Sequence, residues 1–203
     1  MSNNPIPVDS AASKANSWWR FRRWVHRNRS AFHVVAGIFA LAFSRPTDLG
    51  NAIALVIVLI GMFLRIWANS CIRKNVELCT VGPYSIVRHP LYLGNFVIML
   101  GVCIAANSLL VIIAGCAFMA LVYAIVIPDE EEKLRRLFGQ AYENYARRVP
   151  AFLPNPLTIG AWSFSVGAVN WRRAARDVFL ISLLVAMFEL KEDVLERVYR
   201  VEY

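Results

Sequence analysis

The sequence predicts an all-α membrane protein, a polytopic bundle of four to five transmembrane helices with a cytoplasmic amphipathic helix. Hydrophobic residues make up 58% of the 203 positions and charged residues 18%, which is too apolar for an ordinary soluble domain. The 40 residues 89–128 contain no Asp, Glu, Lys or Arg. The net charge of +8 is gathered in blocks between apolar runs, a pattern typical of membrane proteins and not of a nucleic-acid-binding face.

The uncharged run 89–128 is too long for one crossing of a bilayer. As a helix rising about 1.5 Å per residue it would measure roughly 60 Å, against a hydrocarbon core of about 30 Å. We therefore expect two antiparallel spans, near 91–106 and 108–127. The break between them should fall at Ala106-Asn107-Ser108, the most polar point of the run.

Three further apolar runs predict the rest of the bundle. Residues 30–44 and 49–64 should form a first hairpin, closed by a turn at Pro46, with Arg65 reaching the interface from the end of the second span. Residues 178–188 are shorter and fit an interfacial helix or a fifth, partial span. Residues 1–29 form a basic, Trp-containing interfacial N-terminus, and 30–203 a single membrane-embedded domain.

The basic residues also predict the orientation. Lys and Arg are concentrated in 14–29, 73–88 and 133–176, whereas the two opposite loops hold a single Arg. The positive-inside rule then places the N-terminus and all three basic segments in the cytoplasm. The polar beginning, with no small-residue cleavage site after the first apolar run, predicts no cleavable signal peptide. The four Cys residues have no metal-ligand spacing and are interpreted as free thiols, so no metal site is expected.

A first motif, Gly82 to Gly94, precedes and opens the third span. It reads Gly-Pro-Tyr-Ser-Ile-Val-Arg-His-Pro-Leu-Tyr-Leu-Gly. Gly82 and the proline after it mark a turn, and Pro90 suits the first turn of a helix. Arg88 and His89 should therefore lie at the membrane surface, at a helix N-terminus that favours anions. A basic interfacial anchor is the simpler interpretation of the same residues.

A second motif follows the fourth span, where Pro128 should begin a separate amphipathic helix over 129–148. Glu131 and Glu132 each have an Arg four positions on, which supports the helix. Glu130 instead shares a face with Leu134 and Phe138, and a carboxylate on an apolar face is costly without a partner. An acidic first turn matched to the helix dipole is the simpler alternative.

The predicted hairpin returns both motifs to the same membrane face, so residues near 82–94 and 129–142 should be neighbours. One motif offers Arg, His, Tyr and a helix N-terminus, and the other offers a carboxylate. Such a site could hold a zwitterionic ligand that carries both an amino group and a carboxylate. S-adenosylmethionine is one such ligand, although these residues alone do not single it out.

The two motifs together resemble the isoprenylcysteine carboxyl methyltransferase family and the related phospholipid N-methyltransferases. The resemblance covers roughly 60–155. In the first motif it rests on Arg88-His89-Pro90, with Tyr92 and Gly94. In the second it rests on Glu130-Glu131 and the residues that follow: Leu134, Phe138-Gly139, Tyr142, Tyr145 and Val149-Pro150. It implies a membrane-embedded, non-Rossmann methyltransferase that uses S-adenosylmethionine. The absence of a glycine-rich loop after a strand agrees with it.

The resemblance implies roles for individual residues. His89, Pro90, Leu91, Tyr92 and Glu130 match cofactor-binding positions; Arg88 and His89 are the catalytic candidates, and Tyr84 and Glu131 the substrate-binding ones. The implied acceptor is lipophilic, first of all a carboxylate of isoprenylcysteine type, reached from the bilayer. Family members that act on prenylated cysteine carry an Arg one helical turn before the glutamate, where this chain has Val126.

Three alternatives stay open from the sequence: a phospholipid amine N-methyltransferase, an NADPH-dependent membrane reductase and a non-enzymatic membrane protein. An amine acceptor would need a base, for which His89 or Glu131 are candidates. The reductases carry a different motif where this chain has Glu130-Glu131. A transporter should place ionisable residues in mid-membrane, and 89–128 has no acidic residue, Lys or Arg. The sequence does not indicate an oligomeric state.

Overall fold

The described part of the protein is helical. The computed structural model describes residues 48–72 and 76–155 continuously, together with scattered residues between 20 and 39 and between 163 and 191. Its elements are α2 (Asp48–Cys71), the 3-10 helix η1 (Gly82–Ser85), α3 (Pro90–Ala105), α4 (Leu109–Phe138) and α5 (Gln140–Ala146). No strand occurs among these residues, which agrees with the predicted all-α, non-Rossmann class.

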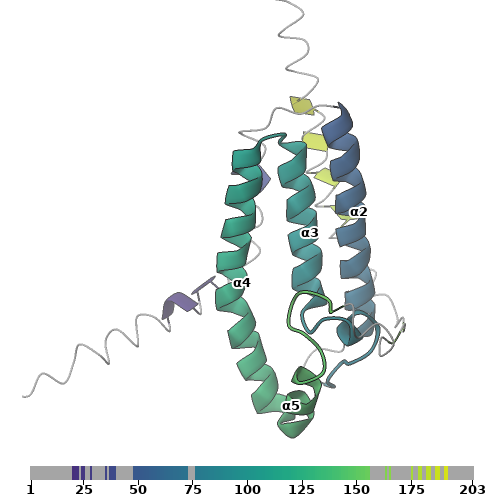
Figure 1. Ribbon diagram of the computed structural model, residues 1–203, viewed down its shortest axis with the longest axis vertical. Helices are drawn as coiled ribbons and strands as arrows, with labels where there is room; N and C mark the ends of the chain where they lie inside the picture. The colour runs from purple at the N-terminus through teal and green to yellow at the C-terminus, as the bar shows by residue number, and fades with distance from the viewer. Residues whose placement is uncertain are drawn as a thin grey trace, which may run out of the picture.

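Helices α2 and α3 lie side by side over most of their lengths, with α4 on the other flank of α3 (Figure 1). Small residues make the α2–α3 contact close. A Cβ added to Gly61 of α2 would lie 2.8 Å from the carbonyl oxygen of Gly94 in α3, and one added to Gly101 would lie 3.0 Å from that of Ala54. This is the small-residue packing by which helix backbones approach one another in membrane proteins.

The turn between α3 and α4 falls where the sequence predicts it. Helix α3 ends at Ala105, α4 begins at Leu109, and Asn107 adopts a positive φ of 48° in the turn. Asparagine tolerates this left-handed conformation better than most residues, because its short polar side chain can bond locally. The prediction that 89–128 folds as two antiparallel helices is confirmed, and the two motifs are returned to one end of the bundle (Figure 1).

The end of α4 corrects one prediction. Pro128 does not begin a separate helix; it lies inside α4, which continues without a break to Phe138. Proline fixes φ near −65°, which suits a helix, and the missing N–H removes only one backbone bond. The chain breaks instead at Gly139, whose φ of 51° is left-handed, and only then does the short α5 follow.

Two described helices, α2 from Leu49 and α4, are long and apolar enough to cross a membrane, and α3 is a shorter apolar helix. A bilayer core of about 30 Å needs about 20 helical residues, so the apolar 109–128 is the part of α4 that fits it. The charged residues 129–136 lie beyond. These helices suggest membrane localisation. The predicted spans at 30–44 and 178–188 lie outside the continuously described chain, so four to five spans are not established.

Arg65 of α2 contacts α3. Its guanidinium donates a hydrogen bond to the side-chain oxygen of Asn95 on α3. This bond adds a polar link to the glycine-rich contact between the two helices. A hydrogen bond from a charged donor is worth about 1.5–3 kcal/mol, so the pair reinforces the packing on which the position of α3 depends.

Candidate active site

The first motif is folded around η1, between α2 and α3. Gly82 has a φ of 61°, and the hydroxyl of Ser85 donates to the Gly82 carbonyl at 2.7 Å. The hydroxyl of Tyr145 in α5 donates to the Tyr84 carbonyl, also at 2.7 Å. A residue 61 positions further along the chain therefore holds the turn in place.

The segment after α5 returns along the first motif. The backbone N–H of Arg88 donates to the carbonyl of Pro150 at 2.8 Å, and that of His89 donates to Ala151 at 3.1 Å. His89 is the N-cap residue of α3. Its backbone amide would otherwise lie at an open helix start, where N–H groups need partners from outside the helix. The irregular segment at 150–151 thus holds the backbone of Arg88 and His89.

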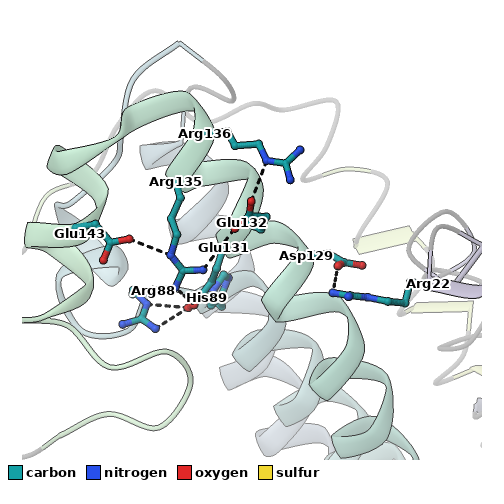
Figure 2. Close-up of polar contacts among 9 residues, drawn as sticks. All are labelled: Arg22, Arg88, His89, Asp129, Glu131, Glu132, Arg135, Arg136 and Glu143. Atoms are coloured by element: carbon teal, nitrogen blue, oxygen red, sulfur yellow. Dashed lines mark hydrogen bonds and ion pairs between the residues drawn. The ribbon is translucent and has the colours of Figure 1, made fainter. Parts of the chain in front are cut away.

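Arg88 and Glu131 form a buried ion pair that joins the two motifs (Figure 2). Arg88 donates to Glu131 Oε1 from Nε at 3.0 Å and from Nη2 at 2.6 Å. Its Nη1 donates to the carbonyls of Ala146 at 2.7 Å and Val149 at 2.8 Å. A guanidinium has five N–H donors, and Arg88 directs four of these to other parts of the protein. Its side chain is only 13% exposed, so the bonds are largely shielded from water.

Glu131 is the centre of this cluster. Besides Arg88, the ring nitrogen Nε2 of His89 lies 3.3 Å from Oε1, and Arg135 Nη2 lies 3.4 Å from Oε2. The hydrogen bond from His89, supported by those from Arg88, outweighs the effect of burial and lowers the pKa of Glu131 from 4.5 to about 2. Glu131 is therefore an anion at neutral pH and accepts hydrogen bonds on both oxygens.

Glu130, one residue earlier on α4, meets a different set of groups. The hydroxyl of Tyr92 donates to Glu130 Oε2 at 3.2 Å. The Tyr92 ring stacks on the His89 ring with centroids 5.6 Å apart, and on its other side approaches Tyr123 at 5.3 Å. Tyr123 in turn contacts Phe152 at 5.7 Å. The Glu130 carboxylate thus accepts from a tyrosine that is itself part of a row of aromatic rings.

Helix α5 is joined to α4 beside this cluster. Arg135 Nε donates to Glu143 Oε1 at 3.0 Å, and its guanidinium lies 5.8 Å from the centre of the Tyr142 ring. Tyr142 is fully buried, and burial raises its pKa above the ordinary value, so the phenol is neutral. The ion pair, the cation–π contact and the buried ring orient α5 so that its C-terminal carbonyls face Arg88.

Most of the predicted site residues come together. Arg88, His89, Tyr92, Glu130 and Glu131 are linked by direct contacts. Pro90 is buried at the start of α3 and Leu91 is half-buried beside it. Tyr84 lies apart: its carbonyl is held by Tyr145, and within the described chain its buried hydroxyl has no hydrogen-bond partner.

Sequence reasoning missed two parts of the site. The carbonyls that accept from the first motif belong to residues 146–151, and a carbonyl acceptor leaves no signal in the sequence because every residue carries one. The other is an ion pair between Arg22 and Asp129, which brings the N-terminal segment to the residue before Glu130. Among the described residues no group of three or more His, Cys, Asp or Glu is placed to hold a metal. The four cysteines are free thiols.

Comparison with known proteins shows which proteins the region around this site resembles. Residues 49–141, which hold α2, both motifs and α4, match the model of the phospholipid methyltransferase family. Protein-S-isoprenylcysteine O-methyltransferase B of Arabidopsis thaliana is 36% identical over 82 residues, which are 40% of this chain and 42% of that protein. Over the region that holds both motifs, the chain is therefore similar to phospholipid methyltransferases and to a protein-S-isoprenylcysteine O-methyltransferase, which is the resemblance that the motifs predicted.

Two bacterial relatives are also similar. The nickel-cobalt-cadmium resistance protein NccN of Alcaligenes xylosoxydans xylosoxydans is 46% identical over 93 residues, 44% of this chain and 43% of that protein. The cobalt-zinc-cadmium resistance protein CzcN of Cupriavidus metallidurans is 38% identical over 135 residues, 64% of this chain and 62% of that protein. The chain thus spans about half the length of the curated relatives it matches. No solved structure matches significantly.

Proposed function

We propose that the protein is a membrane-embedded methyltransferase that binds S-adenosylmethionine between the first motif and α4 and methylates a lipophilic acceptor. The observation that carries the proposal is the meeting of the two motifs. Arg88 and Glu131 are 43 residues apart in sequence, and Tyr92 and Glu130 are 38 apart, yet each pair is in direct contact. The similarity to methyltransferases supports the reaction class, and this contact supports the location of the site.

The residues present suit the cofactor. S-adenosylmethionine combines a sulfonium cation with an amino group and ribose hydroxyls, all of which a carboxylate attracts or accepts from. Glu130 is such a carboxylate, and Tyr92, which donates to it, packs against the rings of His89 and Tyr123. Aromatic faces stabilise organic cations by about 0.5–2 kcal/mol each. A carboxylate beside a row of rings therefore fits a cationic, partly apolar ligand, and we assign cofactor binding to Glu130, Tyr92, His89, Pro90 and Leu91.

In this proposal the protein acts mainly by alignment. When bound, S-adenosylmethionine would supply an electrophilic methyl group on its sulfur. Glu130 and Tyr92 hold the ligand by hydrogen bonds, and the neighbouring rings keep water away from it. Arg88 and Glu131 fix the loop that carries His89, so that the site is rigid before the ligand arrives. Such pre-organisation can lower a barrier by several kcal/mol, about 7–11 in favourable cases.

The acceptor is the less defined partner. A prenylcysteine carboxylate is ionised at neutral pH and needs no base, which makes it the first acceptor to test. Val126, one turn before Glu130, is 1% exposed and part of the apolar core, so no cation at that position meets an acceptor carboxylate. A phospholipid amine is therefore the second candidate, and the family match to phospholipid methyltransferases favours testing it in parallel. We expect either acceptor to enter from the bilayer, with the site facing the cytoplasm.

The first experiment measures binding of radiolabelled S-adenosylmethionine to the detergent-solubilised protein. Glu130→Gln should weaken binding at least tenfold, because a charge-assisted hydrogen bond contributes about 1.5–3 kcal/mol. Glu132→Gln is the matched control, since it makes the same change two residues along α4 on a side chain that is 51% exposed. Equal binding by wild type and Glu130→Gln would refute the placement, and no binding by a folded wild type would refute the proposed function.

A second experiment identifies the acceptor. Vesicles that contain the protein receive labelled S-adenosylmethionine with an N-acetylated S-prenylcysteine, its methyl ester or phosphatidylethanolamine. Base-labile label on the free acid, with none on the ester, would establish carboxyl methylation. Base-stable label in the phospholipid would establish N-methylation. Saturable binding of NADPH in place of S-adenosylmethionine would point to a reductase, and no ligand binding at all to a non-enzymatic membrane protein.

A further inference from the structure

The two adjacent glutamates of the second motif have different surroundings. Glu130 meets the phenol of Tyr92, whereas Glu131 accepts from Arg88 and Arg135 and faces the ring of His89. Glu131 is 9% exposed, so most of its surface is already covered by these groups. A residue so enclosed has little surface left for a substrate, the role expected of it from the sequence. Its contacts instead define the state of His89.

The contact between His89 and Glu131 determines which ring nitrogen of His89 carries a proton. A carboxylate flanked by guanidinium groups is ionised and can only accept, so the Nε2 that lies 3.3 Å from Oε1 must be the donor. In a neutral imidazole one nitrogen donates and the other accepts. With the hydrogen on Nε2, the lone pair is on Nδ1, which makes no hydrogen bond within the described part of the chain.

The His89 ring is also held in place. Its side chain is 4% exposed, its face stacks on Tyr92, and its backbone N–H is bonded to Ala151. Rotation of the ring would break the contact to Glu131 and the stacking at once. Glu131 cannot follow such a rotation, because Arg88 binds the same oxygen through two N–H groups. One carboxylate thus fixes both the proton and the orientation of the imidazole.

We infer that Glu131 is a positioning residue that holds His89 as its Nε2–H tautomer, which leaves Nδ1 as a hydrogen-bond acceptor for a ligand. The inference rests on the proposed function only in calling that ligand the cofactor or the methyl acceptor. It assigns the ligand a donor group, such as an amino, ammonium or hydroxyl hydrogen, at this point. It also gives the second glutamate of the motif a task separate from that of the first.

The test reads the tautomer directly by nitrogen-15 NMR of histidine-labelled protein in detergent. The chain has three histidines, so replacing His26 and His33 by Gln leaves His89 as the single signal. Spectra are recorded at alkaline pH, because an imidazolium carries a hydrogen on both nitrogens and does not report a tautomer. We expect a protonated Nε2 and an unprotonated Nδ1, with the large chemical-shift separation of one pure tautomer. Nδ1–H, or averaged shifts in the parent protein, would overturn the inference.

Variants then test whether Glu131 is the cause. Glu131→Gln should move both nitrogens towards averaged shifts, because an amide can donate as well as accept. Glu132→Gln, on the exposed side of α4, should leave the spectrum of the parent unchanged. If Glu131→Gln does not fold, Glu131→Asp keeps the carboxylate and should keep the Nε2–H form. A pure Nε2–H spectrum in folded Glu131→Gln would overturn the assignment of the positioning role to Glu131.

The measurement needs neither cofactor nor acceptor, so its outcome is independent of the proposed function. A protein that shows the expected tautomer but binds no S-adenosylmethionine would refute the proposed function and retain the inference. A protein that binds S-adenosylmethionine but shows Nδ1–H would do the reverse. Addition of S-adenosylmethionine to the parent is the final step, and a shift of the Nδ1 signal on binding is the expected result.

Discussion

Replacing Arg88 by Met removes the charge and the hydrogen bonds of the side chain but keeps an unbranched side chain in its place. The variant therefore measures the contribution of the ion pair apart from that of packing. The change removes two hydrogen bonds to Glu131 and two to the carbonyls of Ala146 and Val149. Breaking a buried ion pair by removing one partner costs about 3–5 kcal/mol. Arg135 and His89 remain as partners of Glu131, so we expect the lower end, about 3 kcal/mol.

Arg88→Lys divides this loss into two parts. The ammonium keeps a positive charge beside Glu131 but cannot reproduce the planar fork that reaches Ala146 and Val149. Two lost hydrogen bonds at about 1 kcal/mol each give an expected destabilisation of about 2 kcal/mol. The order of stability should therefore be wild type, then Arg88→Lys, then Arg88→Met.

The assay is reversible unfolding of the detergent-solubilised protein, followed by circular dichroism as denaturant is added. Arg136→Met and Arg136→Lys are the matched controls, since Arg136 also pairs with a glutamate of α4 but is 76% exposed. Exposed pairs contribute about 0–1 kcal/mol, so these variants should stay close to wild type. If Arg88→Met is as stable as Arg136→Met, the buried pair does not hold the two motifs together and the reasoning fails.

Three further predictions address charge, packing and the turn. The pKa of Glu131 is lowered from 4.5 to about 2, so its stabilising contribution is present above pH 4.5 and is lost as the pH falls towards 2. In the same unfolding assay, the difference in stability between wild type and Glu131→Gln should therefore shrink over that pH range. Gly61→Ala places a Cβ 2.8 Å from the Gly94 carbonyl oxygen, so α2 and α3 must separate; we expect a loss of about 1–3 kcal/mol, and an unchanged midpoint would show that the contact is looser than described. Asn107→Ala should destabilise by about 1 kcal/mol because of the positive φ, and Asn107→Gly should not, so equal effects of the two would exclude backbone conformation as the cause.

Much of the described architecture could be predicted from the order of residue types. The uncharged run 89–128 is about twice as long as one crossing, which required a hairpin, and its polar point at 106–108 located the turn. The hairpin in turn brought the Arg88-His89 motif next to Glu130-Glu131. The end of α4 was less predictable. Proline favours the first turn of a helix and is disfavoured in its interior, so the position of Pro128 inside α4 depends on the surrounding chain and not on local preference.

The division of work between the two glutamates could not be predicted. On a helix, neighbouring positions point about 100° apart, so one of them faces a given partner and the other does not. The sequence pattern selected Glu130 as the unusual acid, because it lies on the face of Leu134 and Phe138. The buried ion pair with Arg88 is nevertheless made by Glu131, with Glu130 turned towards Tyr92. Packing against other segments sets the rotation of α4 about its own axis, and this rotation determines which of the two glutamates faces Arg88.

By itself the sequence determined that the chain is helical and apolar enough for a membrane, where its long uncharged run reverses, and which two charged motifs the reversal brings together. These properties follow from hydropathy, helix length and turn chemistry, all of which act locally along the chain. Only the tertiary structure decided which carboxylate meets Arg88, which nitrogen of His89 faces it, and that the carbonyls of 146–151 complete the site. Those choices depend on helix rotation and on contacts between residues more than 40 positions apart, which no local pattern encodes.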